Sequence, residues 1–195
     1  LEDSVIVNII LFGPPGAGKG TQAKFLVKKL NGLQISTGEI LRNEIVKNTE
    51  IGKLITNDMD KGKFVSDEIV NDLIKSIVFN PKNKNRLIFD GYPRSITQAK
   101  NLDKLLNSSD QKIDFIFFLN VGKEIIIKRI KKRRVLENRS DDETGTILNR
   151  YDTYMETTKP VLEFYSKNPN FKELDGSQEI DQITKKIDNF LNVKT

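Results

Sequence analysis

The segment Gly-Pro-Pro-Gly-Ala-Gly-Lys-Gly-Thr, residues 13–21, joins a strand pattern to a helix pattern. Before it, residues 5–11 form an apolar run rich in β-branched side chains, which predicts a buried parallel strand that ends in a turn. After it, apolar residues recur at helical spacing from Ala23 to Leu30, and an Asn-Gly pair then stops the pattern. The sequence therefore predicts a strand, a glycine-rich loop and a helix, in that order.

The glycine-rich loop has the chemistry of a phosphate-binding loop. Glycines let the backbone wrap closely around a phosphate, the start of the helix directs N–H groups at it, and Lys19 can reach the outer phosphates. The general pattern places Ser or Thr directly after the lysine to bind magnesium, whereas here Gly20 follows and Thr21 comes next. We therefore expect magnesium to be held mainly by nucleotide oxygens and water.

Further apolar runs predict an α/β fold. Four short runs predict strands at residues 33–35, 87–89, 115–119 and 171–174. Helical patterns separate them, and this alternation predicts a five-stranded, mostly parallel sheet with helices on both faces. Between the second and third predicted strands, helical patterns occur near residues 39–47, 51–61 and 67–79. One crossover needs fewer helices, so we expect an inserted subdomain there. Farther on, a polar stretch at residues 135–142 interrupts two long helical patterns.

Composition narrows the chemistry that the chain can perform. The 195 residues favour a single domain, and they include no cysteine and no histidine. Catalysis by Ser-His-Asp or Cys-His groups and the commonest transition-metal sites are thereby excluded. Carboxylates, lysine, arginine, hydroxyls, backbone amides or a hard cation remain, and this set suits phosphate chemistry.

Charge and hydropathy suggest neither a membrane nor a nucleic-acid partner. No apolar run approaches the roughly 20 residues that span a bilayer, and residues 1–4 carry two acids instead of the basic start of a signal peptide. We therefore expect a cytoplasmic protein. The net charge is +5, and residues 128–134 (KRIKKRR) could be read as a nucleic-acid patch. This run contains no aromatic residue for base stacking, and solvated helix faces explain it more simply.

Arginines and one aspartate are candidate phosphate and magnesium ligands. Guanidinium groups share phosphate oxygens in a bidentate way, and the candidates are Arg42, Arg94, Arg129, Arg133, Arg139 and Arg150. With the glycine-rich loop they suggest a cationic cradle for two nucleotides. Asp90 ends a predicted strand, where its carboxylate could order magnesium-bound water; the alternative is an Asp that caps a helix or turn.

Several motifs together resemble one family. The form GxPGxGKGT resembles the phosphate loop of adenylate kinases and related nucleoside monophosphate kinases, and the likeness extends in the family's order over nearly the whole chain. The other motifs that carry it are ISTGEILR at residues 35–42, GKFV at 62–65, DGYPR at 90–94 with Gln98, and RSDD at 139–142 with Arg150.

The resemblance implies a fold, a division of the chain and a reaction. The fold would be that of the P-loop NTPases in one domain, with core residues 1–35, 66–132 and 143–195. A helical monophosphate-binding insertion would occupy residues 36–65 and a short lid residues 133–142. Only residues 135–138 separate Arg134 from Arg139, so the lid would lack the extra hairpin and the zinc ligands of long-lid members. The implied enzyme is a cytoplasmic, monomeric, magnesium-dependent kinase that converts ATP and AMP into two ADP.

The resemblance also implies roles for individual residues. Catalysis would rest on Lys19, Arg94, Arg133, Arg139 and Arg150. ATP would be bound by Gly16, Ala17, Gly18, Lys19, Gly20, Thr21, Arg133 and Gln178, the last through the backbone of its loop. AMP would be bound by Thr37, Arg42, Lys63, Phe64, Val65, Gly91, Tyr92, Pro93, Arg94, Gln98, Arg139 and Arg150. Both the insertion and the lid would close over the substrates, because water would otherwise take the phosphoryl group.

The choice of monophosphate depends on two residues. Thr37 and Gln98 stand where AMP-specific members read adenine, and a primary amide can pair with adenine's donor and acceptor edge. Uridylate and cytidylate kinases tend to carry Ala and Asn there, so a pyrimidine monophosphate kinase is the second hypothesis. A third hypothesis is a nucleotide-binding module without catalysis, which we would expect to lack Lys19 or several arginines.

Overall fold

The structure is a computed structural model, and it describes residues 6–61, 65–137 and 142–192. The strands are β1 (Ile9–Phe12), β2 (Leu33–Ser36), β3 (Leu87–Asp90), β4 (Phe115–Asn120) and β5 (Phe171–Asp175). The helices are α1 (Lys19–Leu30), α2 (Thr37–Val46), α3 (Glu50–Asp60), α4 (Asp67–Val78), α5 (Ile96–Ser108), α6 (Lys123–Glu137), α7 (Asp142–Ser166) and α8 (Ile180–Asn192), with a 3-10 helix at Pro81–Asn83.

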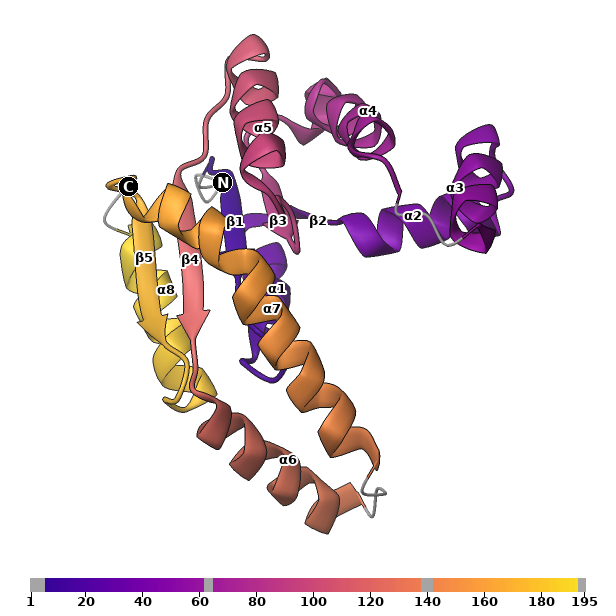
Figure 1. Cartoon of the computed structure of the whole chain (residues 1–195). Coiled ribbons are helices and arrows are strands. Elements are labelled where there is room, and N and C mark those ends of the chain that lie inside the picture. Colours follow the sequence, from indigo (N-terminus) through magenta and orange to yellow (C-terminus); the bar gives the residue numbers. More distant parts are fainter. Residues whose placement is uncertain (1–5, 62–64, 138–141, 193–195) are drawn as a thin grey trace.

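All five strands form one parallel sheet in the order β2-β3-β1-β4-β5 (Figure 1). The central strand β1 pairs on one side with β3, where Ile9 lies opposite Ile88, and on the other with β4, where Ile9 lies opposite Phe115. The predicted five-stranded α/β fold is confirmed.

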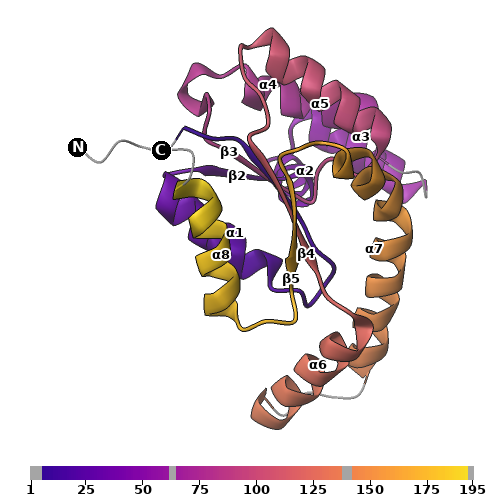
Figure 2. The same ribbon diagram turned by 90° about the vertical axis from the view of Figure 1, so that its left-hand side faces the viewer.

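Two apolar cores lie on the two faces of the sheet. Side chains alternate along β1, so Ile9 and Leu11 join one core while Ile10 and Phe12 join the other. Helices α1 and α8 cover the first face, and α4, α5 and the end of α7 cover the second, as Figure 2 shows edge-on. Because both faces are covered, the three inner strands β1, β3 and β4 are almost wholly apolar and buried, whereas the edge strands β2 and β5 carry polar, partly exposed residues.

The first strand begins later than the predicted range of residues 5–11. Residue 5 lies outside the described residues, and β1 starts only at Ile9. The reason is Asn8, whose buried side chain bonds to the neighbouring segments. Its Oδ1 accepts from the backbone N–H of Leu87 at 3.0 Å, and its Nδ2 donates to the carbonyl of Lys112 at 3.0 Å. The other predicted strand ends lie within about one residue of those observed.

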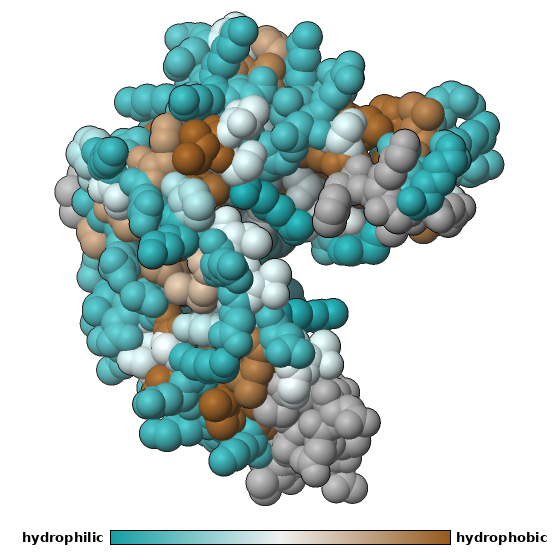
Figure 3. Space-filling view, viewed as in Figure 1, coloured by the Kyte–Doolittle hydropathy of each residue, from teal (hydrophilic) through white to brown (hydrophobic). Residues whose placement is uncertain are grey.

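Two helical arms extend from the sheet. Helices α2 and α3 form one arm, and the far parts of α6 and α7 form the other (Figure 1). Figure 3 shows the surface hollowed between them. Residues 135–137, predicted as part of a polar interruption, instead continue α6. Within the described ranges, no helix has both the length and the apolar character needed to cross a membrane.

Candidate active site

The site lies at the carboxyl edge of the sheet, between β1 and β3. These strands are neighbours, but the helices that follow them, α1 and α5, pack on opposite faces of the sheet. Such a divergence opens a crevice beyond the strand ends, which is where parallel α/β sheets bind ligands. The glycine-rich loop leaves β1 into this crevice, and Asp90 ends β3 beside it.

The glycine-rich loop has a shape that only glycine adopts easily. Gly16 and Gly18 both have a φ of 85°, in the left-handed region, and the N–H of Ala17 closes a turn on the carbonyl of Pro14 at 3.1 Å. Helix α1 starts at Lys19, with Gly18 as an N-cap that has no side chain to accept from its first N–H groups. These N–H groups can therefore receive an anion, as the sequence predicts.

Two distant side chains hold this loop in place. The backbone N–H of Gly13 donates to the hydroxyl of Tyr154 on α7 at 2.8 Å, and burial raises the pKa of Tyr154 to about 12, so the hydroxyl stays neutral. Arg129 on α6 donates from Nη1 to the carbonyl of Gly16 at 2.9 Å and from Nη2 to the carbonyl of Gly176. Arg129 thereby ties the phosphate loop to the loop after β5.

Lys19 and Asp90 form an ion pair, with 2.6 Å between Nζ and Oδ1. The Lys19 side chain is 24% exposed and that of Asp90 13%. The other oxygen of Asp90, Oδ2, accepts from Nε2 of Gln34 on β2 at 2.9 Å. The carboxylate thus faces the glycine-rich loop and is the counter-ion of Lys19.

The segment after β3 turns back on itself. Gly91 has a φ of 74°, and its carbonyl accepts from Nε of Arg94 at 2.8 Å. The side chain of Tyr92 is fully buried against Phe89, and burial raises its pKa to about 12. Pro93 is buried as well. Any contact between Tyr92 and a ligand is therefore left to its backbone, whereas Arg94 is exposed.

Gln98 and Thr37 are both buried, at 8% exposure each. The Gln98 amide makes two hydrogen bonds, from the backbone N–H of Arg94 and to Asp67, at 2.8 Å each. Thr37 begins α2 and lines a small pocket between α2 and α4, whose other lining residues are Ile40, Leu41, Val70, Leu73 and Ile74. The pocket is small, and apart from Thr37 its lining is apolar.

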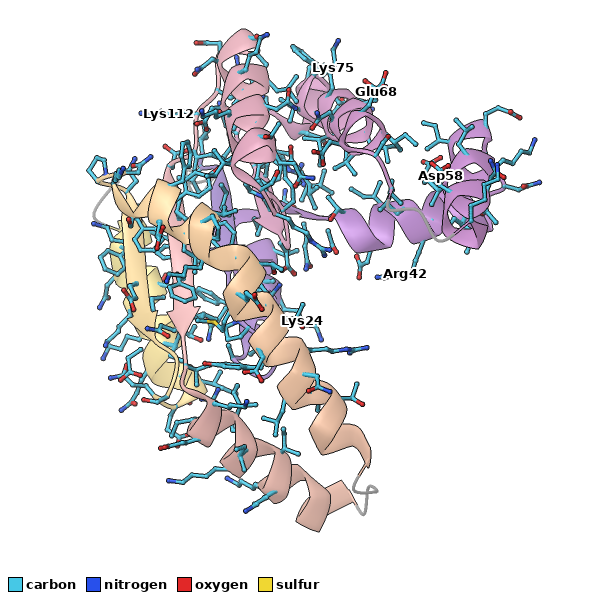
Figure 4. The ribbon with its side chains drawn as sticks, in the orientation of Figure 1. Lys24, Arg42, Asp58, Glu68, Lys75 and Lys112 are labelled. Atoms are coloured by element: carbon cyan, nitrogen blue, oxygen red, sulfur yellow. The ribbon has the colours of Figure 1, made fainter. Side chains whose placement is uncertain are left out.

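Four more of the predicted site residues lie on other elements of the chain. The exposed Arg42 lies along α2 with its guanidinium over Gly38, on the side of the helix that faces the opening (Figure 4). Val65 is partly buried and packs against the core beside α4. Arg150 is exposed on α7, one turn before Tyr154. Oε1 of Gln178, in the loop before α8, is buried with no hydrogen-bond partner within the described part of the chain.

Three of the predicted site residues lie outside the described part of the chain, namely Lys63, Phe64 and Arg139. Arg133 falls within α6, four residues after Arg129 along the chain.

Sequence reasoning missed the partners that hold the site residues. Tyr154, Gln34 and Asp67 were not candidates, although each bonds directly to a predicted site residue or to the start of the glycine-rich loop. Tyr154 is 141 residues from Gly13, and no local pattern marks such a pair.

Comparisons with known proteins agree on one family. The family model described as adenylate kinase matches residues 11–170. An adenylate kinase from Pelagibacter ubique is 50% identical over 213 aligned positions, which cover 96% of this chain and all of that protein. Adenylate kinases from Flavobacterium psychrophilum and Methanocella arvoryzae are 40% and 38% identical, and the alignments cover 96% and 91% of this chain and 99% and 95% of the relatives. This chain belongs to the adenylate kinase family.

Proposed function

We propose that the protein transfers a phosphoryl group reversibly between ATP and AMP to give two ADP. The observation that carries the proposal is the glycine-rich loop, with Lys19 at its end, placed beside Asp90 in the crevice between β1 and β3. The relatives named above, all called adenylate kinase, support it. Such an enzyme would contribute to adenine nucleotide homeostasis.

The proposed chemistry needs no protein base. The attacking group is the phosphate of AMP, which is already ionised, so catalysis rests on positioning and on positive charge around the transferring group. Lys19, Arg133, Arg139 and Arg150 would supply that charge, with Arg94 holding the attacking phosphate. Apart from the bond from Nε to Gly91, no hydrogen bond of the Arg94 side chain forms within the described residues, so its Nη groups keep four N–H donors for a phosphate.

ATP and AMP would occupy different sides of the crevice. The loop at residues 16–21, Arg133 and the backbone near Gln178 would bind ATP. Thr37, Arg42, residues 63–65, residues 91–94, Gln98, Arg139 and Arg150 would bind AMP. We propose the corresponding division into a core, an insertion at residues 36–65 and a short lid at residues 133–142.

Magnesium would accompany ATP. This ion takes oxygen ligands and usually keeps several waters, so it would be held mainly by nucleotide oxygens and water, with the Asp90 carboxylate beside Lys19. Bound magnesium would neutralise phosphate charge, and Asp90 would reach it through water once the phosphates draw Lys19 away. We further propose that the enzyme works as a cytoplasmic monomer without zinc.

The test is a coupled assay of ADP formation from ATP and magnesium, run in parallel with AMP, UMP, CMP and GMP. Strong activity with AMP alone is the expected result. A preference for UMP or CMP would keep the chemistry but favour a pyrimidine monophosphate kinase, and the assignment of Thr37 and Gln98 would be wrong. No activity with any of the four would favour a nucleotide-binding module without catalysis.

A further inference from the structure

The side-chain amide of Gln98 is fixed by two partners of opposite kind. Its Oε1 accepts from the backbone N–H of Arg94, and its Nε2 donates to Oδ1 of Asp67, both at 2.8 Å. Asp67 is the first residue of α4, whereas Gln98 lies in the first turn of α5, where its backbone N–H donates to the N-cap Ser95. Two helix ends therefore meet at this amide.

These partners allow only one orientation of the amide. A backbone N–H can only donate, and an ionised carboxylate can only accept. If the Gln98 amide turned by 180°, its NH2 group would face the N–H of Arg94 and its oxygen would face the carboxylate of Asp67. Both contacts would then be repulsive, and Gln98 is only 8% exposed. Of these two partners, only Asp67 bonds through its side chain, so only this contact can be changed by a substitution.

The fixed amide keeps a defined capacity for a ligand. A primary amide has two N–H donors and two acceptor positions on its oxygen. Arg94 uses one acceptor position and Asp67 uses one donor, so one donor remains on Nε2 and one acceptor on Oε1. Adenine presents the complementary pair, an acceptor at N1 and a donor at N6. A 6-oxopurine such as hypoxanthine or guanine presents the reverse, a donor at N1 and an acceptor at O6.

Asp67 also stands beside the place where a base would lie. The helix that it begins, α4, supplies Val70, Leu73 and Ile74 to the pocket that Thr37 closes from α2. The same helix thus lines the small apolar pocket and orients the amide that is proposed to read the base. We infer that Asp67 is a specificity-determining positioning residue, which holds Gln98 in the orientation that accepts adenine and rejects 6-oxopurines. The inference rests on the proposed function, because it takes a purine monophosphate as the ligand.

The test compares AMP with inosine monophosphate, which differs from AMP only at the edge that the amide would read. We expect Asp67→Asn to raise the ratio of kcat/KM for inosine monophosphate to that for AMP by about tenfold, because an asparagine can donate or accept and so removes one of the two repulsive contacts that oppose a turned Gln98 amide, the one with Arg94 remaining. Asp67→Glu keeps a partner that can only accept, so it should retain the adenine preference. The KM for ATP should not change in either variant.

The matched control is Glu68→Gln, which removes an equal charge from the same turn. Glu68 is exposed and projects from the outer side of α4 (Figure 4). It should leave the ratio unchanged. The inference is wrong if Asp67→Asn keeps the original ratio. It is also wrong if Asp67→Asn and Glu68→Gln raise the ratio equally, which would indicate an effect of charge alone.

A binding measurement keeps this inference separate from the proposed function. Calorimetric titration of each variant with AMP and with inosine monophosphate gives the same comparison without turnover. An original chain that binds AMP but shows no kinase activity would contradict the proposed function and leave the inference standing on the binding ratio. An original chain that binds neither purine monophosphate would overturn both. Thermal unfolding of each variant shows whether the fold is retained.

Discussion

The hydroxyl of Tyr154 links a helix of one arm to the start of the phosphate loop. It accepts the N–H of Gly13 at 2.8 Å, and Arg150 precedes it by one helical turn. Residues four apart lie on the same side of a helix, so the hydrogen bond that places Tyr154 also limits where Arg150 can lie relative to Lys19. A residue without a chemical role thus sets the distance between two residues proposed to hold the transferring phosphate.

Replacing Tyr154 by phenylalanine should reveal this bond through its pH dependence. Near pH 8 we expect the Tyr154→Phe variant to be about 1–2 kcal/mol less stable, because the buried N–H of Gly13 loses its acceptor. The pKa of Tyr154 is raised from its ordinary 10 to about 12 in the folded protein. The contribution of Tyr154 to the free energy of unfolding is therefore complete below pH 10 and is lost as the pH rises towards 12.

The measurement is urea unfolding of both proteins between pH 8 and pH 11.5. The free energy of unfolding of the original chain should fall more steeply above pH 10, by about 1.4 kcal/mol per pH unit relative to the variant. The difference between the two should therefore shrink with rising pH. Lysines titrate in both proteins alike and cancel in the comparison. A difference that stays constant up to pH 11.5 would contradict the assigned cause.

The hairpin of α2 and α3 is built around one glycine. Gly52 is buried in the first turn of α3, where its N–H donates to Oγ1 of Thr49 at 3.0 Å. A Cβ at this position would overlap the carbonyl oxygen and carbon of Glu44 in α2. The overlap is with backbone, which cannot swing aside as a flexible side chain would. The two helices can approach this closely only because residue 52 has no side chain.

The change Gly52→Ala should therefore destabilise the protein, although Gly→Ala in a helix ordinarily stabilises. In an open helical position, Gly→Ala stabilises by about 1 kcal/mol; here we expect a loss of about 1–3 kcal/mol from overpacking, with a raised KM for AMP and an unchanged KM for ATP. Gly145→Ala in α7 is the control, because a Cβ there meets nothing within 4 Å. Thermal unfolding should move in opposite directions for the two variants, and a stabilised Gly52→Ala protein would refute the proposed close packing.

Strands and helices were largely predictable, whereas their junctions were not. The inner strands β1, β3 and β4 are buried on both faces, so their apolar runs stand out in the sequence. The start of β1 was misplaced because Asn8 bonds through its side chain to Leu87, 79 residues away. For the site, the motifs supplied the candidate residues, whose roles stay predictions, while the partners that hold them, such as Gln34 for Asp90, depend on the completed sheet.

The molecule as a whole has an open shape. The arm of α2 and α3 and the arm of α6 and α7 stand apart on either side of the crevice, and Arg42 lies on a surface that faces this opening (Figures 3 and 4). Lys19 and Asp90 lie at its base and are already partly shielded. The crevice is open in this form, and we expect the arms to approach each other so that the phosphoryl group passes to AMP rather than to water.

Closure should be measurable by amide hydrogen exchange. We expect an inhibitor that joins two adenosines through five phosphates to slow exchange in α2, α3, the end of α6 and the start of α7, because it would contact both arms at once. Strands β1 and β4 are buried in the centre of the sheet and should exchange equally slowly with and without it. Equal protection of both arms in the free and bound protein would show that they do not close.

The strand order also determines when the sheet can form during synthesis. The central strand β1 is synthesised before either neighbour, and Ile9 precedes its partner Phe115 on β4 by 106 residues. At a translation rate of 5–20 residues per second, that interval lasts roughly 5–20 seconds. Throughout it, a strand of four apolar residues has no native partner on that side. A ribosome-bound chain that ends before β4 is therefore exposed to aggregation, and chaperones would be needed early rather than after release.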